Sequence, residues 1–94
     1  MRTATLRIKK KYYDAIKKGI KKEEYRADSP YYQNLFKNKV DIIKLHYQSG
    51  EHLLVKVKGI KKIKAPRWLI AAGMLEKIHL TEHIFRIRLA EILT

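Results

Sequence analysis

The first residues of the chain alternate between apolar and polar side chains. Over residues 3–9, Ala4, Leu6 and Ile8 fall on one side of an extended backbone, and the polar side chains between them fall on the other. This period of two is typical of a strand with one buried face. We therefore expect a strand over residues 3–9.

The next apolar residues have helical spacing. Over residues 11–18, Ala15 and Ile16 follow Tyr12 by three and four positions, so the three side chains share one face of a helix. Gly19 comes directly after two lysines, and glycine is common after a helix whose last turn carries cations. The pattern predicts a short helix that ends at Gly19.

Alternation returns in residues 21–28. Tyr25 and Ala27 lie on one face of an extended segment, and the other face carries four charged side chains, which are Lys22, Glu24, Arg26 and Asp28. The pattern predicts a second strand with a charged face. Because Arg26 belongs to that polar face, we expect its side chain to contribute little to the core.

A connection and a hairpin are predicted next. Ser29-Pro30 breaks the alternation, and the aromatic-rich residues 31–36 form a connection of about one helical turn. Residues 40–48 and 52–63 are rich in β-branched side chains that alternate in part. Ser49-Gly50-Glu51 separates these two runs and is typical of a hairpin loop.

A second helix and a last strand complete the pattern. Pro66 suits the first turn of a short helix and Gly73 its exit. Residues 83–92 alternate as a strand, with Phe85, Ile87 and Leu89 inward and Arg86 and Arg88 outward. The order of elements indicates an α+β domain over residues 1–94. In it, about five strands curl into a small barrel flanked by two short helices, because curling removes exposed sheet edges.

Composition narrows the class of protein. With 94 residues, 46% of them hydrophobic, and only four Gly and two Pro, the chain is suited to one folded domain. It has no cysteine, so neither disulfides nor a thiolate zinc site support it, and a reducing cytoplasm is the expected location. The start of the chain has no apolar signal region, and no run approaches the roughly 18 apolar residues of a membrane span. We therefore expect neither secretion nor a membrane partner.

The net charge of the chain indicates the kind of partner that it binds. The chain has 22 Lys and Arg against 9 Asp and Glu, a formal net charge of +13. The excess is uneven, since residues 52–75 contain six basic residues and no acidic one. Such a field attracts phosphate backbones independently of sequence. RNA is the expected partner and single-stranded DNA the second. An acidic protein partner and a surface that serves solubility alone fit the charge as well.

One short segment resembles a known signature. Gly19-Ile20-Lys21-Lys22-Glu23-Glu24-Tyr25-Arg26 follows a strand and a tyrosine-containing helix. It resembles the Gly-x-Lys-x-x-Glu-x-Arg stretch of the ASCH domains, relatives of the PUA RNA-binding fold. The resemblance extends over most of the chain. It implies a small PUA-like barrel in which Lys21, Glu24 and Arg26 line a cleft for a nucleotide or an RNA segment.

Some ASCH members are ribonucleases or amidohydrolases that act on acetylated cytidine, so the resemblance also implies a hydrolase as the alternative. In a hydrolase, Lys21 and Glu24 would form the acid–base pair. The chain departs from the family at Lys22, where Thr is common. It departs again at Glu24, where the amidohydrolase-type members carry a Thr nucleophile, and this argues against that amidase activity.

The residues themselves suit a binding site. Arg26 offers a planar fork for phosphate or a guanine edge. Glu24 shares its strand face and can accept from an exocyclic amine or orient the guanidinium. Lys21 points away under strict alternation, but the loop after Gly19 can turn it back. An exposed face with ion pairs of ~0–1 kcal/mol is the alternative. The expected nucleic-acid-binding residues are Lys21, Lys22, Glu24, Arg26, Tyr31, Tyr32, Lys56, Lys58, Lys61, Lys62 and Arg67.

Aromatic side chains can stack on unpaired bases. Tyr31 and Tyr32 lie in the connection beside the charged strand, so they are better candidates than Tyr12, whose spacing with Ile16 indicates packing. Tyr13 and Trp68 are further candidates.

Other chemistry finds little support in the sequence. His79 and His83 are four apart, but His83 begins a predicted strand, and no zinc-protease motif or cysteine accompanies the pair. We expect no metal and no cofactor. Ser29 and Ser49 lie in predicted turns without a nearby pattern of His and acid, so serine hydrolase chemistry is not expected.

Overall fold

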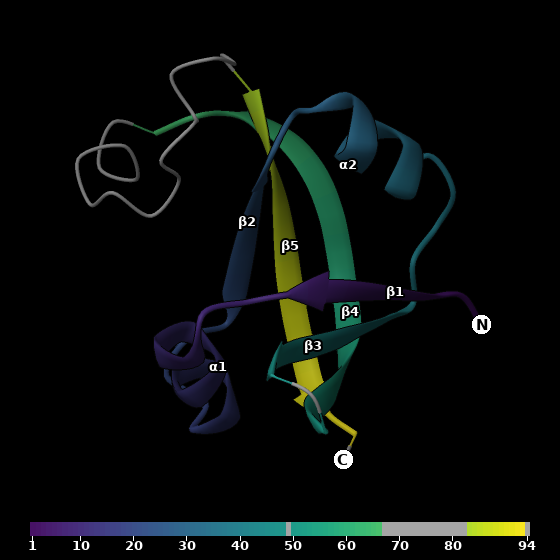
Figure 1. The fold of residues 1–94 in the computed structure, drawn as a ribbon. Helices are drawn as coiled ribbons and strands as arrows, with labels where there is room; N and C mark the ends of the chain where they lie inside the picture. Colours follow the sequence, from purple (N-terminus) through teal and green to yellow (C-terminus); the bar gives the residue numbers. More distant parts are fainter. Residues whose placement is uncertain (49, 67–82, 94) are drawn as a thin grey trace.

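The structure is a computed structural model that describes residues 1–48, 50–66 and 83–93. Five strands and two helices follow one another in these described residues (Figure 1). The strands are β1 (Thr3–Arg7), β2 (Glu23–Ala27), β3 (Ile42–Gln48), β4 (Glu51–Lys64) and β5 (His83–Ile92). The helices are α1 (Lys10–Lys17) and α2 (Pro30–Leu35).

The five strands form one sheet in the order β1-β3-β4-β5-β2. β1 pairs with β3 in parallel, and the other neighbours are antiparallel. The sheet curls, so that β1 and β3 cross the long strands β4 and β5 at a steep angle in Figure 1. β1 and β2 are the two edges of the resulting half-barrel. The predicted α+β class with about five curled strands is therefore confirmed.

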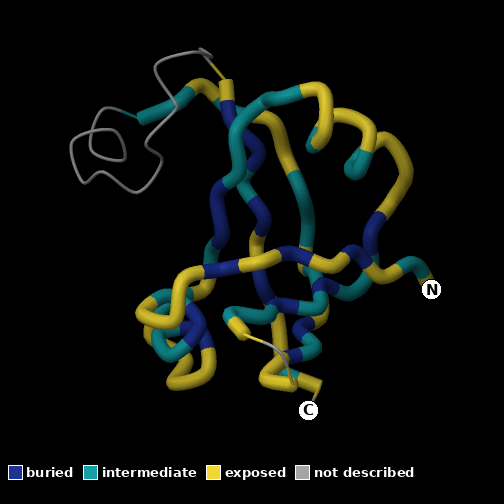
Figure 2. Tube along the Cα trace, in the orientation of Figure 1, coloured by how far each residue is buried: buried dark blue, intermediate teal, exposed yellow. Residues whose placement is uncertain are grey.

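The concave face of the sheet holds the main core. Ala4 and Leu6 of β1 pack in one buried cluster with Ile87 and Leu89 of β5, which brings edge and central strands together across the curl. Figure 2 shows how buried and exposed positions alternate along β1, as the period of two predicts. On the opposite face of the sheet, Tyr25 and Ile84 form a second, smaller buried cluster.

The first helix ends as predicted. Gly19 has a φ of 77°, a left-handed conformation that glycine adopts without steric cost. The buried side chains of α1 are Tyr13 and Ile16. Tyr12 is partly buried and packs against the core, as its spacing with Ile16 predicts, but the pattern did not single out Tyr13.

The connection after β2 is a helix. Pro30 stands in the first turn of α2, and the side chain of Ser29 caps the helix by accepting from the backbone N–H of Tyr32 at 3.4 Å. The hairpin of β3 and β4 and the last strand, His83–Ile92, agree with the predicted segments. The helix predicted from Pro66 to Gly73, with Arg67 and Trp68, falls almost wholly outside the described residues.

Candidate functional site

The charged face of β2 points into the half-barrel. Glu24 lies opposite Ile87, and Arg26 lies opposite Phe85, in the ladder between β2 and β5. Directly opposite residues share a face of a sheet, and Ile87 and Phe85 are buried. Glu24 is only 7% exposed. The alternative of an exposed strand face with solvated ion pairs is therefore wrong for Glu24 and Arg26, because the curl of the sheet turns this part of the face inward.

Arg26 is the centre of a polar network. Its guanidinium donates to the Tyr32 hydroxyl at 2.9 Å and to the Glu24 carboxylate at 2.9 Å. It also donates to the backbone carbonyl oxygen of Arg7 at 2.8 Å. Arg26 thereby joins β2 to the end of β1 and to α2 across the open side of the half-barrel. The expectation that Arg26 contributes little to the interior is also wrong.

The charge of Arg26 is held by its partners. Burial lowers the pKa of its guanidinium, but the neighbouring Glu24 carboxylate and Tyr32 hydroxyl raise it by more, so the pKa is above its ordinary value. The other carboxylate oxygen of Glu24 accepts from the backbone N–H of Tyr25 at 3.0 Å. Both oxygens of Glu24 therefore have hydrogen-bond donors.

Lys21 joins this network from the loop after α1. Its Nζ donates to the backbone carbonyl oxygen of Glu23 and lies 3.4 Å from Oε1 of Glu24. The loop that follows Gly19 turns the side chain back toward the strand, which strict alternation would not do. The rings of Tyr12 and Tyr25 also flank the ammonium group, with centroids 5.8 and 5.5 Å away. Lys21 is therefore a fixed cation.

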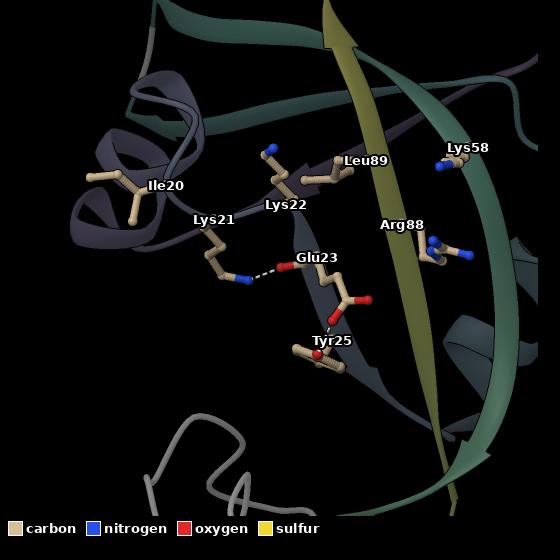
Figure 3. A pocket seen from close by; sticks show the side chains of 8 residues that line it. All are labelled: Ile20, Lys21, Lys22, Glu23, Tyr25, Lys58, Arg88 and Leu89. Carbon is tan, nitrogen blue, oxygen red and sulfur yellow. Dashed lines mark hydrogen bonds between the residues drawn. The ribbon is translucent and has the colours of Figure 1, made fainter.

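A pocket of about 460 Å³ opens beside the start of β2 (Figure 3). Its volume lies within the range of ligand sites, about 300–1,000 Å³. The lining residues are Ile20, Lys21, Lys22, Glu23, Tyr25, Lys58, Arg88 and Leu89. Glu24 and Arg26 are not among them, so the structure brings Lys21 and Lys22 of the predicted motif to the pocket and leaves the other two in the interior network.

Strand pairing brings the cations of the pocket together. The carbonyl oxygen of Lys22 accepts from the backbone N–H of Leu89 at 2.9 Å, which continues the pairing of β2 with β5. Arg88 of β5 lies between Glu23 of β2 and Gly59 of β4 in one row of the sheet. The register shifts there, because β4 advances two residues from Val57 to Gly59 while β5 advances one. Lys58 is the extra residue of this bulge, and bulges re-aim side chains in this way.

Three of these cations have no acidic partner in the part of the chain that the structure describes. Among the described residues, Lys22, Lys58 and Arg88 are exposed and form no ion pair. Exposed cations without counter-ions create a local positive potential. A neighbouring pocket of about 770 Å³ shares Lys21, Lys22 and Lys58 with the first and adds Lys56 and one acidic residue, Glu91. The basic surface therefore continues along β4.

The other lysines predicted to bind nucleic acid differ in the charges beside them. Lys56 lies 3.8 Å from Glu91, and Lys62 lies 3.3 Å from Asp28, so a carboxylate offsets part of the charge of each. Lys61 is exposed and lies opposite Arg86 in the ladder.

Arg88 was predicted as an outward residue, but its place in a site was not predicted. That place depends on the pairing of β5 with both β2 and β4, which alternation along one strand does not reveal.

The tyrosines also divide into different roles. Tyr31 is 62% exposed on α2 and remains a candidate for stacking on a base. Tyr32 is partly buried, and its ring stacks on Phe36 with centroids 5.9 Å apart. Tyr13 is 3% exposed and packs edge-on against Tyr47, so its role is in the core.

In the part of the chain that the structure describes, no group of three or more His, Cys, Asp or Glu side chains is arranged to hold a metal ion. The helices of the same part are too short or too polar to cross a membrane. No protein-family model matches the chain, and no curated protein matches it either.

Proposed function

We propose that the chain is an RNA-binding module anchored by the pocket beside β2. The observation that carries this proposal is the meeting of Lys22, Lys58 and Arg88, from three different strands or their ends, around one pocket without an ion-pair partner among the described residues. The chain as a whole also carries a formal net charge of +13, which attracts a polyanion. Lysine and arginine that are free of carboxylates neutralise phosphates and release the counter-ions of the nucleic acid.

The pocket offers more than charge. Arg88 has a planar fork that binds a phosphate through two parallel hydrogen bonds, whereas Lys22 and Lys58 act as point charges. Ile20 at the rim is 76% exposed and provides apolar surface for a base or a ribose. Such contacts favour an unpaired strand whose bases are accessible, so single-stranded RNA is the proposed ligand and single-stranded DNA the second.

The resemblance to the ASCH domains supports the same proposal. The matching residues Lys21, Glu24 and Arg26 lie in one hydrogen-bonded network, and a curled five-stranded sheet with two helices is compatible with a barrel of that kind. A PUA-like fold and ASCH membership are therefore part of the proposal. Action in the cytoplasm is a further part, since the chain has no cysteine.

Hydrolysis of RNA is the second candidate. It is favoured by one observation: Nζ of Lys21 lies 3.4 Å from Glu24, and the two side chains are only 12% and 9% exposed. A lysine and a carboxylate in contact and largely sheltered from solvent have the geometry of an acid–base pair. We rank it second because both oxygens of Glu24 already have donors and Glu24 does not line the pocket.

Fluorescence anisotropy with a labelled single-stranded RNA tests the proposal. Lys58→Ala is expected to weaken binding to all RNA sequences about equally, by ~1 kcal/mol or about fivefold, because it removes a phosphate contact. Lys37→Ala is the matched control, since Lys37 is exposed and does not line the pocket. Equal affinities of the two variants, or no binding of RNA by the wild type, would contradict the proposal.

A further inference from the structure

One acidic side chain lies in the wall of the basic pocket. Glu23 begins β2 and lies opposite Arg88 of β5. Figure 3 shows its carboxylate between the ring of Tyr25 and the strand that carries Arg88. A site for phosphate alone gains nothing from a carboxylate, because like charges repel. An acceptor in this wall suits a ligand that carries a hydrogen-bond donor as well as a phosphate.

The carboxylate of Glu23 is held in one orientation. The hydroxyl of Tyr25 donates to Oε1, and Nε of Arg86 lies 3.9 Å from Oε2. Burial and the hydrogen bond to Glu23 raise the pKa of Tyr25 to about 12, so this hydroxyl remains a donor at neutral pH. Glu23 is thus a preorganised acceptor.

Glu23 still has acceptor capacity toward the pocket. An ionised carboxylate accepts about four hydrogen bonds, and the contacts with Tyr25 and Arg86 use only part of that capacity. The side chain of Glu23 is 38% exposed. Glu23 therefore lines the same pocket as Lys22, Lys58 and Arg88 with part of its acceptor capacity unused.

We infer that the pocket holds one nucleotide whose phosphate lies on the cations and whose base donates an exocyclic amine to Glu23. This inference rests on the proposed function and adds a base preference to it. Cytosine presents an amino group at the position where uracil presents a carbonyl oxygen, and glutamate is a natural acceptor for that amine. At the same position uracil sets its carbonyl oxygen against the carboxylate, so two acceptors face each other, and the N3–H of uracil reaches Glu23 only if the base shifts in the pocket. The pocket therefore prefers cytosine to uracil.

The test compares oligocytidylate with oligouridylate of equal length, titrated into the wild-type chain at one salt concentration. The expected preference for cytidylate is about tenfold, the order of one good base contact. Glu23→Gln should abolish or reverse it, because the amide of glutamine can donate to the uracil oxygen. Asp14→Asn is the control, since it makes the same change in charge on α1, outside the pocket.

The outcomes separate the two proposals. Equal affinity of the wild type for both oligomers, with both weakened by Lys58→Ala, would overturn the base preference and leave RNA binding standing. No binding of either oligomer would overturn RNA binding itself. Because the wild-type comparison needs no variant, the inference stays testable even if Glu23→Gln fails to fold, and an unchanged preference in a folded Glu23→Gln would also overturn it.

Discussion

Arg26 and Glu24 form a buried ion pair at 2.9 Å that faces the inside of the half-barrel. Their side chains are 14% and 9% exposed, so solvent screens the pair only weakly. The nitrogen of Arg26 that contacts Glu24 also donates to the carbonyl oxygen of Arg7 at the end of β1. The pair therefore links the two edge strands of the sheet, and its first role is structural.

Arg26→Ala should destabilise the fold. Removing one partner of a buried ion pair leaves the other charge without compensation, which costs about 3–5 kcal/mol. Arg7→Ala is the control, because the side chain of Arg7 is exposed and an exposed substitution changes the free energy of unfolding by only about 0.5 kcal/mol. Denaturant unfolding of both variants measures the difference, and similar midpoints would show that the pair contributes nothing to stability.

Gly19→Ala should also destabilise the chain, by about 1–2 kcal/mol, because an alanine in the left-handed conformation brings Cβ too close to the next carbonyl oxygen. Gly59→Ala is the matched comparison. Gly59 does not have a positive φ, and an added Cβ would meet nothing within 4 Å. Thermal melts should show a lower midpoint for Gly19→Ala alone; equal losses in the two variants would contradict the assignment of Gly19 as the helix stop.

The local pattern of apolar and polar residues predicted the strands well, but it did not predict which face of β2 points to the interior. The period of two in β2 correctly predicts that Glu24 and Arg26 share a face. It cannot tell which face is interior, since the polar side is normally the solvent side. The curl of the sheet turns this face inward, and Tyr32 of α2 accepts a hydrogen bond from Arg26 there. Both features depend on contacts between distant parts of the chain.

The pocket was predictable only in part. Lys21, Lys22 and Lys58 were expected among many basic residues, and composition alone does not separate them from Lys56 or Lys62. The separation depends on strand register: a bulge re-aims Lys58, while Glu91 and Asp28 lie beside the other two lysines. Such long-range pairings have no local signal in the sequence.

The stability of the chain should depend on Tyr25 at high pH. The pKa of Tyr25 is raised from 10.0 to about 12, chiefly by burial and then by the hydrogen bond to Glu23. Folding therefore favours the neutral hydroxyl, so its contribution is fully present below pH 10 and is lost as the pH rises through about 12. The stability difference between wild type and Tyr25→Phe should shrink over this range. Unfolding free energies measured at several pH values check this, and a constant difference would contradict it.

Acetylated cytidine should remain intact when incubated with the chain. The amidohydrolase-type members of the family that the motif resembles carry a Thr nucleophile where this chain has Glu24, and Glu24 is held by Arg26 and the backbone of Tyr25. Chromatography of the nucleoside after incubation measures the result. Turnover that disappears in Lys21→Ala would instead support the hydrolase candidate.

The central claim is that Lys22, Lys58 and Arg88 bind RNA phosphates, and the salt dependence of affinity tests it most directly. With about five phosphate contacts, the slope of log affinity against log salt for a single strand should be near −3.5 in the wild type. Replacing all three residues by alanine should bring the slope about 2 units closer to zero, because each contact contributes about 0.7. A control with the exposed lysines Lys17, Lys18 and Lys37 replaced by alanine carries the same loss of charge outside the pocket and should keep a slope near that of the wild type. Equal slopes in the two triple variants, or a wild-type affinity that does not change with salt, would contradict the account.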